Sequence, residues 1–252
     1  MTQNQNPIRY TTPSAVPASG IAHTPGAAPS TLGVMPDARL QAAFLSQAFL
    51  WMFVGLLLTA GVAFVVTSNE RLVLLAAGSF FPLFIVQIGL VVAISALINR
   101  ISATVALGLF FVYAASLGIT IGLIVSSYTG GSVATAFLSA SAMFGAAAIY
   151  GKVTQRSLAR LGGILFMGLI GLIAAMIINL FVGSSQITWL ISLAGVGLFT
   201  ALTAYDVQRI QSGDLAARLG SMEKAAVVGA LQLYLDFINL FLFMLRLFGS
   251  RG

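Results

Sequence analysis

Residues 225–248 read AAVVGALQLYLDFINLFLFMLRLF. The stretch is long enough to cross a bilayer, since a spanning helix needs about 20 mostly apolar residues. It nevertheless contains a carboxylate, Asp236. On a helix, Gln232, Asp236, Asn239 and Arg246 fall within a stripe of roughly 80°. Such a polar stripe on a membrane helix is expected to face the interior of a bundle or a water-filled path.

The composition is that of a polytopic membrane protein. Hydrophobic residues make up 59% of the 252 residues and charged residues only 7%, whereas soluble domains carry about 25% charged residues. The mean hydropathy is +1.01. The net charge of +6 does not indicate nucleic-acid binding, because the basic residues lie at segment ends, as topology signals do. The sequence contains no cysteine, which excludes disulfides and thiolate metal sites.

Seven apolar segments are predicted to span the membrane, so the fold class is all-α. They are Phe44–Val66, Leu72–Ile98, Ile101–Ser126, Val133–Tyr150, Leu161–Val182, Ile187–Ile210 and Ala225–Phe248. Residues 37–252 are therefore predicted to form a transmembrane domain. Residues 1–36 hold six of the seven prolines and the one histidine, His23, and are predicted to be a disordered cytoplasmic tail. The long charged connection Gln211–Lys224 has room for a short interfacial helix.

The distribution of basic residues predicts the orientation. If the N-terminus is cytoplasmic, nine lysine and arginine residues lie on the cytoplasmic side and three outside. The positive-inside rule then places the N-terminus inside and the C-terminus outside.

Two local patterns concern the packing of the helices. Pro82 removes a backbone donor and is expected to kink the second segment, either as a gating hinge or as a packing kink. Gly118 and Gly122 form a GxxxG pattern in the third segment, which favours close helix approach.

A second carboxylate, Asp206, lies near the end of the sixth segment. Ionisable residues at membrane depth are functional-site candidates. The alternatives are that Asp206 pairs locally with Arg209 at the interface, and that Asp236 only holds helices together through hydrogen bonds of about 0.6–2 kcal/mol. Counted from Arg209 and Lys224 at a rise of 1.5 Å per residue, the two carboxylates would differ in depth by about 13 Å. A direct pair requires Arg209 to lie in a hydrated funnel or the seventh helix to start below the interface.

Two stretches resemble the Bax inhibitor-1 family of seven-helix membrane proteins: Thr203–Ile210 (TAYDVQRI) and Ala230–Phe241 (ALQLYLDFINLF). The resemblance covers roughly residues 37 to 250. It implies that the seventh helix is central and that the protein is a pH-sensitive calcium leak that works without ATP. The family's aspartate pair then corresponds to Asp206 and Asp236. An arginine that latches one aspartate corresponds to Arg100, which is otherwise an ordinary topology anchor.

The expected mechanism makes the aspartate pair both sensor and gate. Two carboxylates in contact cannot both ionise cheaply, so they share a proton. Calcium takes six to eight oxygen ligands, and two aspartates supply at most four. Side chains of Tyr205, Gln232 and Asn239, backbone carbonyls or water would supply the others. No cofactor is expected, since Ca²⁺ is the transported ion; the expected partners are the lipid bilayer, calcium and protons.

Three other functions are compatible with parts of the sequence. Tyr205-Asp206 also resembles the first motif of intramembrane aspartyl proteases, but their second motif places Gly-x-Gly before the aspartate, where this chain has Leu233-Tyr234-Leu235. An enzyme is therefore not predicted. A non-transporting regulator that binds another membrane protein, such as a protease or stress-response partner, stays open, as does a proton-coupled transporter. The chain shows no organelle signal, which favours the bacterial inner membrane.

Overall fold

The computed structural model describes residues 38–250, and its regular elements are helices. The predicted tail of residues 1–36, with His23, lies outside the described residues. The helices are α1 (Ala38–Thr67), α2 (Glu70–Gly78), α3 (Phe80–Leu97), α4 (Ala103–Val125), α5 (Gly130–Val153), α6 (Gly162–Val182), α7 (Ser185–Gln211), α8 (Asp214–Leu219) and α9 (Met222–Phe248), with a 3₁₀ turn at Ala159–Leu161. Within this range, seven helices are long and apolar enough to cross a membrane. The predicted fold class is confirmed, and the orientation of the termini stays a prediction.

Hydroxyl side chains fix where several spanning helices begin. Ser102, Thr129, Ser184 and Ser221 precede α4, α5, α7 and α9, and each side chain accepts a hydrogen bond from a backbone N–H in the first turn. These N-caps satisfy donors that the helix itself leaves unpaired. Each of these apolar segments is thus preceded by the small polar residue that starts it.

The second predicted segment, Leu72–Ile98, is wrong as a single kinked helix. It is two helices, α2 and α3, and Ser79 is both the C-cap of the first and the N-cap of the second. Pro82 lies in the first turn of α3, where a backbone N–H has no intrahelical partner to lose. The proline is therefore accommodated at a helix start, and only Phe80–Leu97 spans the membrane. The short helix expected in Gln211–Lys224 is confirmed as α8.

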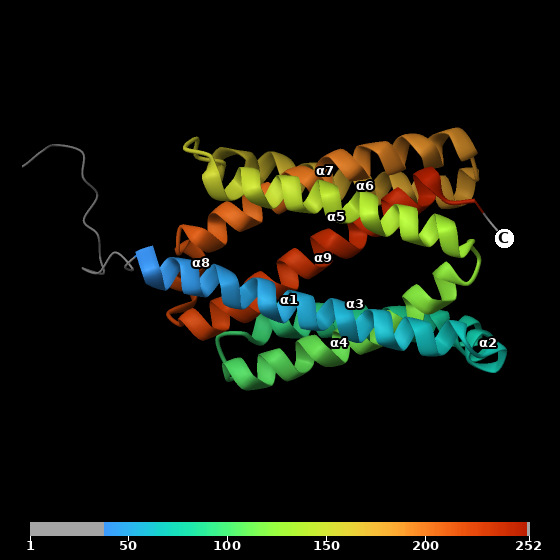
Figure 1. The fold of residues 1–252 in the computed structure, drawn as a ribbon, viewed down its shortest axis with the longest axis horizontal. Helices are drawn as coiled ribbons and strands as arrows, with labels where there is room; N and C mark the ends of the chain where they lie inside the picture. The colour runs from blue at the N-terminus through green and yellow to red at the C-terminus, as the bar shows by residue number, and fades with distance from the viewer. Residues whose placement is uncertain (1–37, 251–252) are drawn as a thin grey trace, which may run out of the picture. The chain divides into compact units, whose positions relative to one another are not determined.

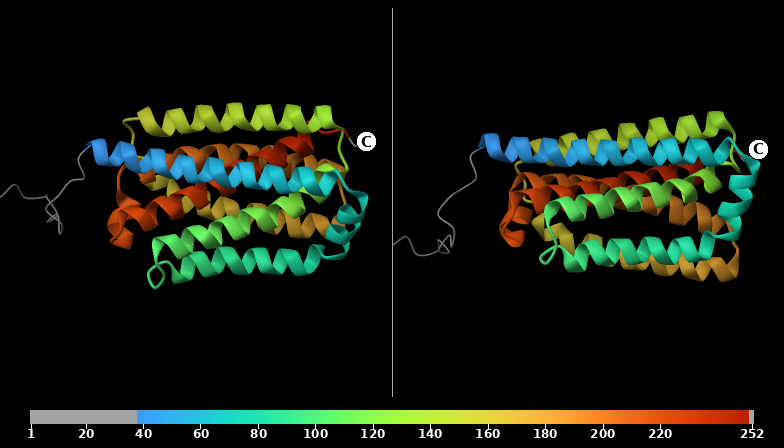
Figure 2. Two further views of the ribbon diagram at one scale, coloured as in Figure 1. Left: turned by 60° about the horizontal axis from the view of Figure 1, so that its bottom comes forward. Right: turned by 90° about the horizontal axis from the view of Figure 1, so that it is seen from below.

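The spanning helices form two groups with α9 between them. Helices α1, α3 and α4 pack together, as do α5, α6 and α7, and α9 contacts α1, α4, α5 and α7. Figures 1 and 2 show α9 crossing obliquely between the groups. In its most apolar stretch 72% of the residues are buried, against 39% or less in every other span. The central seventh helix that the resemblance implied is thus found in the structure.

The GxxxG pattern of α4 allows close contact with α1. A Cβ atom at Gly118 would lie 2.8 Å from the Thr59 carbonyl oxygen and 2.7 Å from the Val62 Cβ. At Gly122 it would lie 3.0 Å from the Ala63 carbonyl oxygen. Because backbone atoms cannot rotate away, only glycine fits at these two positions. The prediction of close approach at this pair is confirmed.

We expect Gly118→Ala to destabilise the fold by about 1–3 kcal/mol, since overpacking against a backbone oxygen must separate α1 and α4. The measurement is thermal unfolding in detergent. Gly108→Ala is the matched control, because a Cβ on that residue of α4 meets nothing within 4 Å; it should gain about 0.5–1 kcal/mol of helix propensity. Equal stability of the two variants would contradict a tight α1–α4 contact at Gly118.

Candidate functional site

The buried polar residues single out the two aspartates. In the described part of the chain these residues are Thr59, Gln87, Thr120, Ser192, Thr203, Asp206 and Asp236. The neutral ones are all hydrogen-bonded; for example, Gln87 Nε2 donates to Thr120 Oγ1 at 2.8 Å. In contrast, Asp236 Oδ2 is buried with no hydrogen-bond partner. A charged group in that position is costly, so packing alone does not explain its presence.

Asp206 and Asp236 line one cavity of about 440 Å³ between α6, α7 and α9, which we call the aspartate cavity. Its lining residues are Gly162, Phe166, Leu169, Leu172, Ile173, Met176, Phe199, Leu202, Tyr205, Asp206, Arg209, Gln232, Leu235, Asp236 and Asn239. The structure thus brings together the two aspartates and the predicted supporting residues Tyr205, Gln232 and Asn239.

The depth difference counted from the sequence does not keep the two carboxylates apart, since both line the aspartate cavity. Helix α7 continues unbroken to Gln211, and Arg209 is half-buried and lines the cavity. Helix α9 also runs obliquely to the helices around it (Figure 1), and a tilted helix rises less than about 1.5 Å per residue along the direction of its neighbours. Arg209 also lines the neighbouring cavity toward α8, and the hydrated funnel around it stays a prediction.

A second cavity, of about 320 Å³, adjoins the first toward α8. This mouth cavity is lined by Gln155, Ser157, Ala159, Tyr205, Gln208, Arg209, Ser212, Asp214 and Arg218. Tyr205 and Arg209 line both cavities. They therefore stand between the polar end of the bundle at α8 and the aspartates.

Gln208 and Gly162, which the sequence pattern did not single out, help to position the residues between the two cavities. Gln208 Oε1 accepts a hydrogen bond from Leu158 N at 2.7 Å, and its Nε2 donates to the Arg156 carbonyl at 2.9 Å. These bonds hold the α5–α6 connection against α7. A Cβ at Gly162 would lie 2.6 Å from the Tyr205 hydroxyl, so the glycine leaves room for that side chain. The glycine pair at the start of α6 was the available signal for this contact.

The structure does not place Arg100 in the aspartate cavity. Arg100 is exposed in the turn after α3, and the arginine that lines the cavity is Arg209. The neighbouring Asn99 carbonyl accepts a bond from Lys224 Nζ at 3.4 Å, which ties this turn to the start of α9. The latch role assigned to Arg100 by resemblance stays a prediction.

The aspartate pair offers an incomplete set of cation ligands. In residues 38–250, no three histidine, cysteine, aspartate or glutamate side chains gather as a metal site. Asn239 Nδ2 donates to the Leu235 carbonyl at 2.7 Å, which leaves Oδ1 as the atom available to a cation. Since calcium takes six to eight oxygens, a bound ion would have to keep several water molecules.

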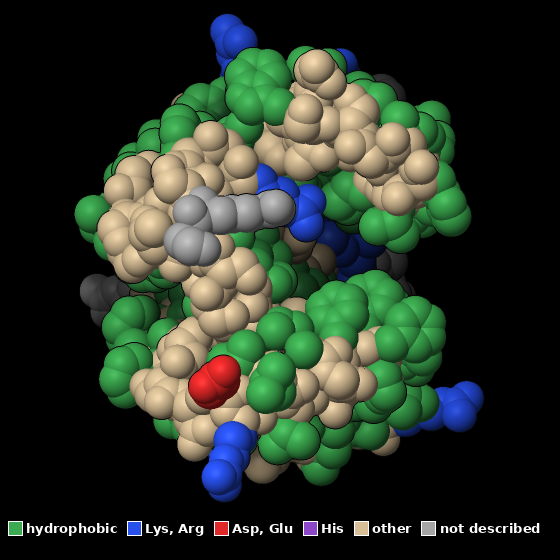
Figure 3. Space-filling view, turned by 90° about the vertical axis from the view of Figure 1, so that its right-hand side faces the viewer, with side chains coloured by type: hydrophobic (Ala, Val, Ile, Leu, Met, Phe, Trp, Pro, Cys, Tyr) green, Lys and Arg blue, Asp and Glu red, His purple; other side chains and the backbone are tan. Residues whose placement is uncertain are grey.

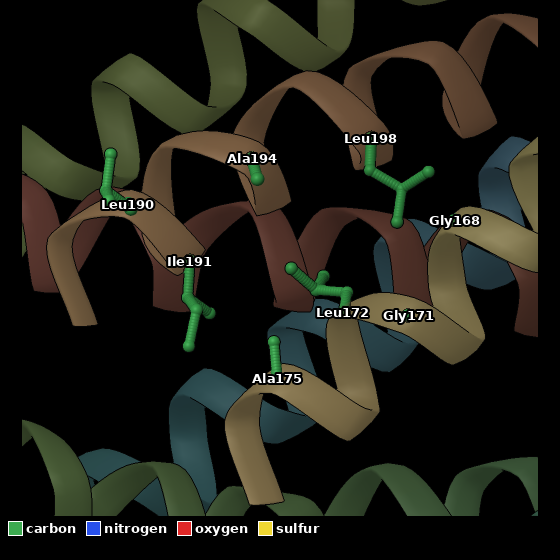
Figure 4. A pocket seen from close by; sticks show the side chains of 8 residues that line it. All are labelled: Gly168, Gly171, Leu172, Ala175, Leu190, Ile191, Ala194 and Leu198. Carbon is green, nitrogen blue, oxygen red and sulfur yellow. The ribbon is translucent and has the colours of Figure 1, made fainter. Parts of the chain in front are cut away.

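Other cavities in the bundle lack this chemistry. One of about 410 Å³ lies between α6 and α7 and is lined only by glycine and aliphatic side chains (Figure 4). Seen from the end at α2, the molecule has a hollow between the two helix groups that contains basic side chains (Figure 3). A cavity of about 460 Å³ lined by Ser127, Tyr128 and Arg246 lies at this end. The polar stripe of α9 therefore divides, with Arg246 in a different cavity from Asp236.

Comparisons with known proteins give a consistent result. The family model described as "Inhibitor of apoptosis-promoting Bax1" matches residues 41–252. The inner membrane protein YbhL of Escherichia coli K12 is 41% identical over 224 residues, which cover 86% of this chain and 95% of YbhL. An uncharacterized protein of Deinococcus radiodurans is 42% identical over 209 residues, 82% of this chain and 90% of that protein. An uncharacterized protein of Borreliella burgdorferi is 41% identical over 213 residues, 82% and 92% of the two chains.

We expect Asp236→Asn to stabilise the fold. The substitution keeps the shape of the side chain and removes a charge that lacks a partner, and an uncompensated buried charge is strongly unfavourable. The thermal midpoint in detergent should rise by about 2–4 °C for each kcal/mol gained in a chain of this size. The gain should be larger in alkaline than in acidic buffer, since only the charged form of the wild type is penalised.

Ser192→Ala is the control for this measurement, because it deletes a buried hydroxyl that is hydrogen-bonded, to the Thr188 carbonyl at 2.8 Å. Its thermal midpoint should fall. A fall of similar size in Asp236→Asn would mean that the fold stabilises the carboxylate, and an unpartnered buried charge at Asp236 would be ruled out.

Proposed function

This chain belongs to the Bax inhibitor-1 family of membrane proteins, and on that premise we propose that it is a pH-sensitive calcium leak channel gated by Asp206 and Asp236. Its place is the bacterial inner membrane, the location that the name of its relative YbhL states for that protein. The observation that carries the proposal is that both carboxylates line one cavity inside the membrane-spanning bundle.

The shared cavity supports a coupled protonation of the two aspartates. Two carboxylates in a site of low polarity hold one proton between them more cheaply than two negative charges. The unpaired Oδ2 of Asp236 is an acceptor for such a proton. Loss of that proton creates the charge that attracts a cation, so calcium and the proton compete for the same oxygens.

The two adjoining cavities support an entry route for the ion. Ions would enter the mouth cavity near α8 and reach the aspartates past Tyr205 and Arg209, which line both cavities. The positive charge of Arg209 opposes a cation at this point, so its displacement is one step of opening.

An apolar barrier closes the route beyond the aspartates. Phe199 lies seven residues before Asp206 on α7, and Phe243 lies seven residues after Asp236 on α9. Because the two helices are antiparallel, both rings lie about 10 Å beyond the pair toward α2. Their centroids are 5.8 Å apart. In the proposed mechanism this arrangement is the closed state: the aromatic pair blocks passage, and opening requires α7 and α9 to shift relative to each other.

The first test is calcium flux into liposomes that contain the purified protein, from about pH 5.5 to about pH 8, the range over which a shared proton is expected to titrate. The calcium concentration that half-saturates flux should rise as pH falls, by up to about tenfold per pH unit, because the proton competes with calcium. Asp206→Asn and Asp236→Asn should each remove most of this pH dependence.

Ser192→Ala, which is buried in α7 away from the aspartate cavity, should keep the wild-type profile. Absence of flux at every pH, with folded protein, would refute the channel. The non-transporting regulator that binds another membrane protein would then be the better account.

A second test concerns which arginine controls the pair. Arg209→Gln should lower the half-saturating calcium concentration by about a hundredfold, because removal of a unit charge roughly 10 Å from a divalent ion is worth about 3 kcal/mol in a medium of effective dielectric about 20. Arg218→Gln, which changes only the mouth cavity, should have a much smaller effect. If Arg100→Gln alters flux and Arg209→Gln does not, Arg100 is the latch and the entry route past Arg209 is wrong.

A further inference from the structure

A separate cavity of about 400 Å³ lies on the other side of α9, between α1, α4 and α5. We call it the lateral cavity. It is lined by Leu56, Thr59, Ala60, Ala63, Phe64, Thr67, Ile121, Val125, Gly130, Val133, Ala134, Phe137, Phe237, Ile238 and Phe241. The end of α1 and the beginning of α5 both contribute, so it lies in the half of the bundle nearer to α2. Figures 1 and 2 show α1 and α5 on either side of α9.

The lateral cavity is lined by apolar side chains and by hydroxyls that are already hydrogen-bonded. Its lining is aliphatic and aromatic apart from Thr59 and Thr67. The Thr59 hydroxyl lies 2.6 Å from the Tyr234 hydroxyl and 2.9 Å from the Gly55 and Ala114 carbonyl oxygens. Thr67 Oγ1 donates to the Phe64 carbonyl at 3.0 Å. Both hydroxyls are therefore satisfied within the protein, and an occupant need offer them nothing.

The lateral cavity opens to the surface of the spanning helices. Phe64 and Phe137 line it and are 73% and 49% exposed, whereas Phe241 at its back is 6% exposed. At the depth of the spanning segments, the medium outside is hydrocarbon. Water does not occupy an apolar cavity of this kind, and an empty one loses contacts in proportion to its volume. The volume falls in the usual range of ligand sites, about 300–1,000 Å³.

We propose that the lateral cavity binds one acyl chain of a membrane phospholipid, taken from the leaflet at the α2 end. The chain would enter beside Phe64 and Phe137 and lie against Phe237 and Phe241. These rings pack on Phe137 with centroids 5.7 and 6.5 Å away. The site does not depend on the calcium proposal, but it uses the face of α9 that lies opposite Asp236. An acyl chain bound there supports the central helix that carries the carboxylate.

The test uses the full chain in lipid nanodiscs that contain phosphatidylglycerol with a photoactivatable group in the middle of one acyl chain. After irradiation, labelled peptides are mapped by mass spectrometry. The proposal predicts label on the buried α9 segment 237–241. Ala134→Trp, at the cavity wall, should reduce this label by about tenfold, the effect of excluding roughly two methylene groups.

Ala174→Trp, on the exposed face of α6 and outside the lateral cavity, is the matched control and should leave α9 labelling unchanged. Label on Leu180 and Phe181, which are 82% and 84% exposed, reports ordinary surrounding lipid in all variants. Ala60→Trp fills the same cavity from α1 and replaces Ala134→Trp in the experiment if that variant fails to fold. The proposal is overturned if α9 is labelled no more than other buried segments, or if neither tryptophan reduces its label.

Discussion

The burial of α9 is the constraint on which the remaining structure depends. This helix carries Asp236 at membrane depth, where contact with lipid would be prohibitive for a charged group. It lies between two groups of spans and contacts α1, α4, α5 and α7, and it is far more buried than any other span. The groups can approach it closely because small residues occur at the contacts, such as Gly195 of α7, where a Cβ would lie 2.6 Å from the Phe243 ring of α9. A helix that packs only against protein can then keep a polar stripe.

The stripe explains why the two sides of α9 differ. Asp236 and Asn239 face the aspartate cavity with α6 and α7. The very next side chain, Phe237, faces α5 and the lateral cavity. A helix turns by about 100° per residue. Consecutive residues of α9 therefore point to different sides, and the carboxylate of Asp236 and the ring of Phe237 face different cavities. The acyl-chain site and the aspartate cavity are therefore both lined by α9. A movement of α9 that opens one cavity also changes the other.

Much of the fold could be predicted from the sequence, because hydropathy reports burial in lipid directly. The break at Ser79 could not be predicted from hydropathy, because α2 and α3 form one apolar run in the sequence. Only the capping at Ser79 separates the two helices. Helical periodicity and the family resemblance pointed to five of the residues that line the aspartate cavity: Asp206, Asp236, Tyr205, Gln232 and Asn239. The place of Arg209 in the cavity lining could not be predicted in this way, because the count of residues took Arg209 itself as the membrane interface. The lateral cavity depends on the spacing between α1 and α5, which no single segment encodes.

The central claim is that Asp206 and Asp236 share one proton, and infrared difference spectroscopy tests it most directly. A protonated carboxyl group has a carbonyl stretching band that can be followed in lipid as pH is varied. The account predicts one such band in the wild type, and a changed titration of the remaining group in both Asp206→Asn and Asp236→Asn, because each aspartate sets the protonation of the other. Independent titrations, each unaffected by substitution of the other aspartate, would contradict the claim.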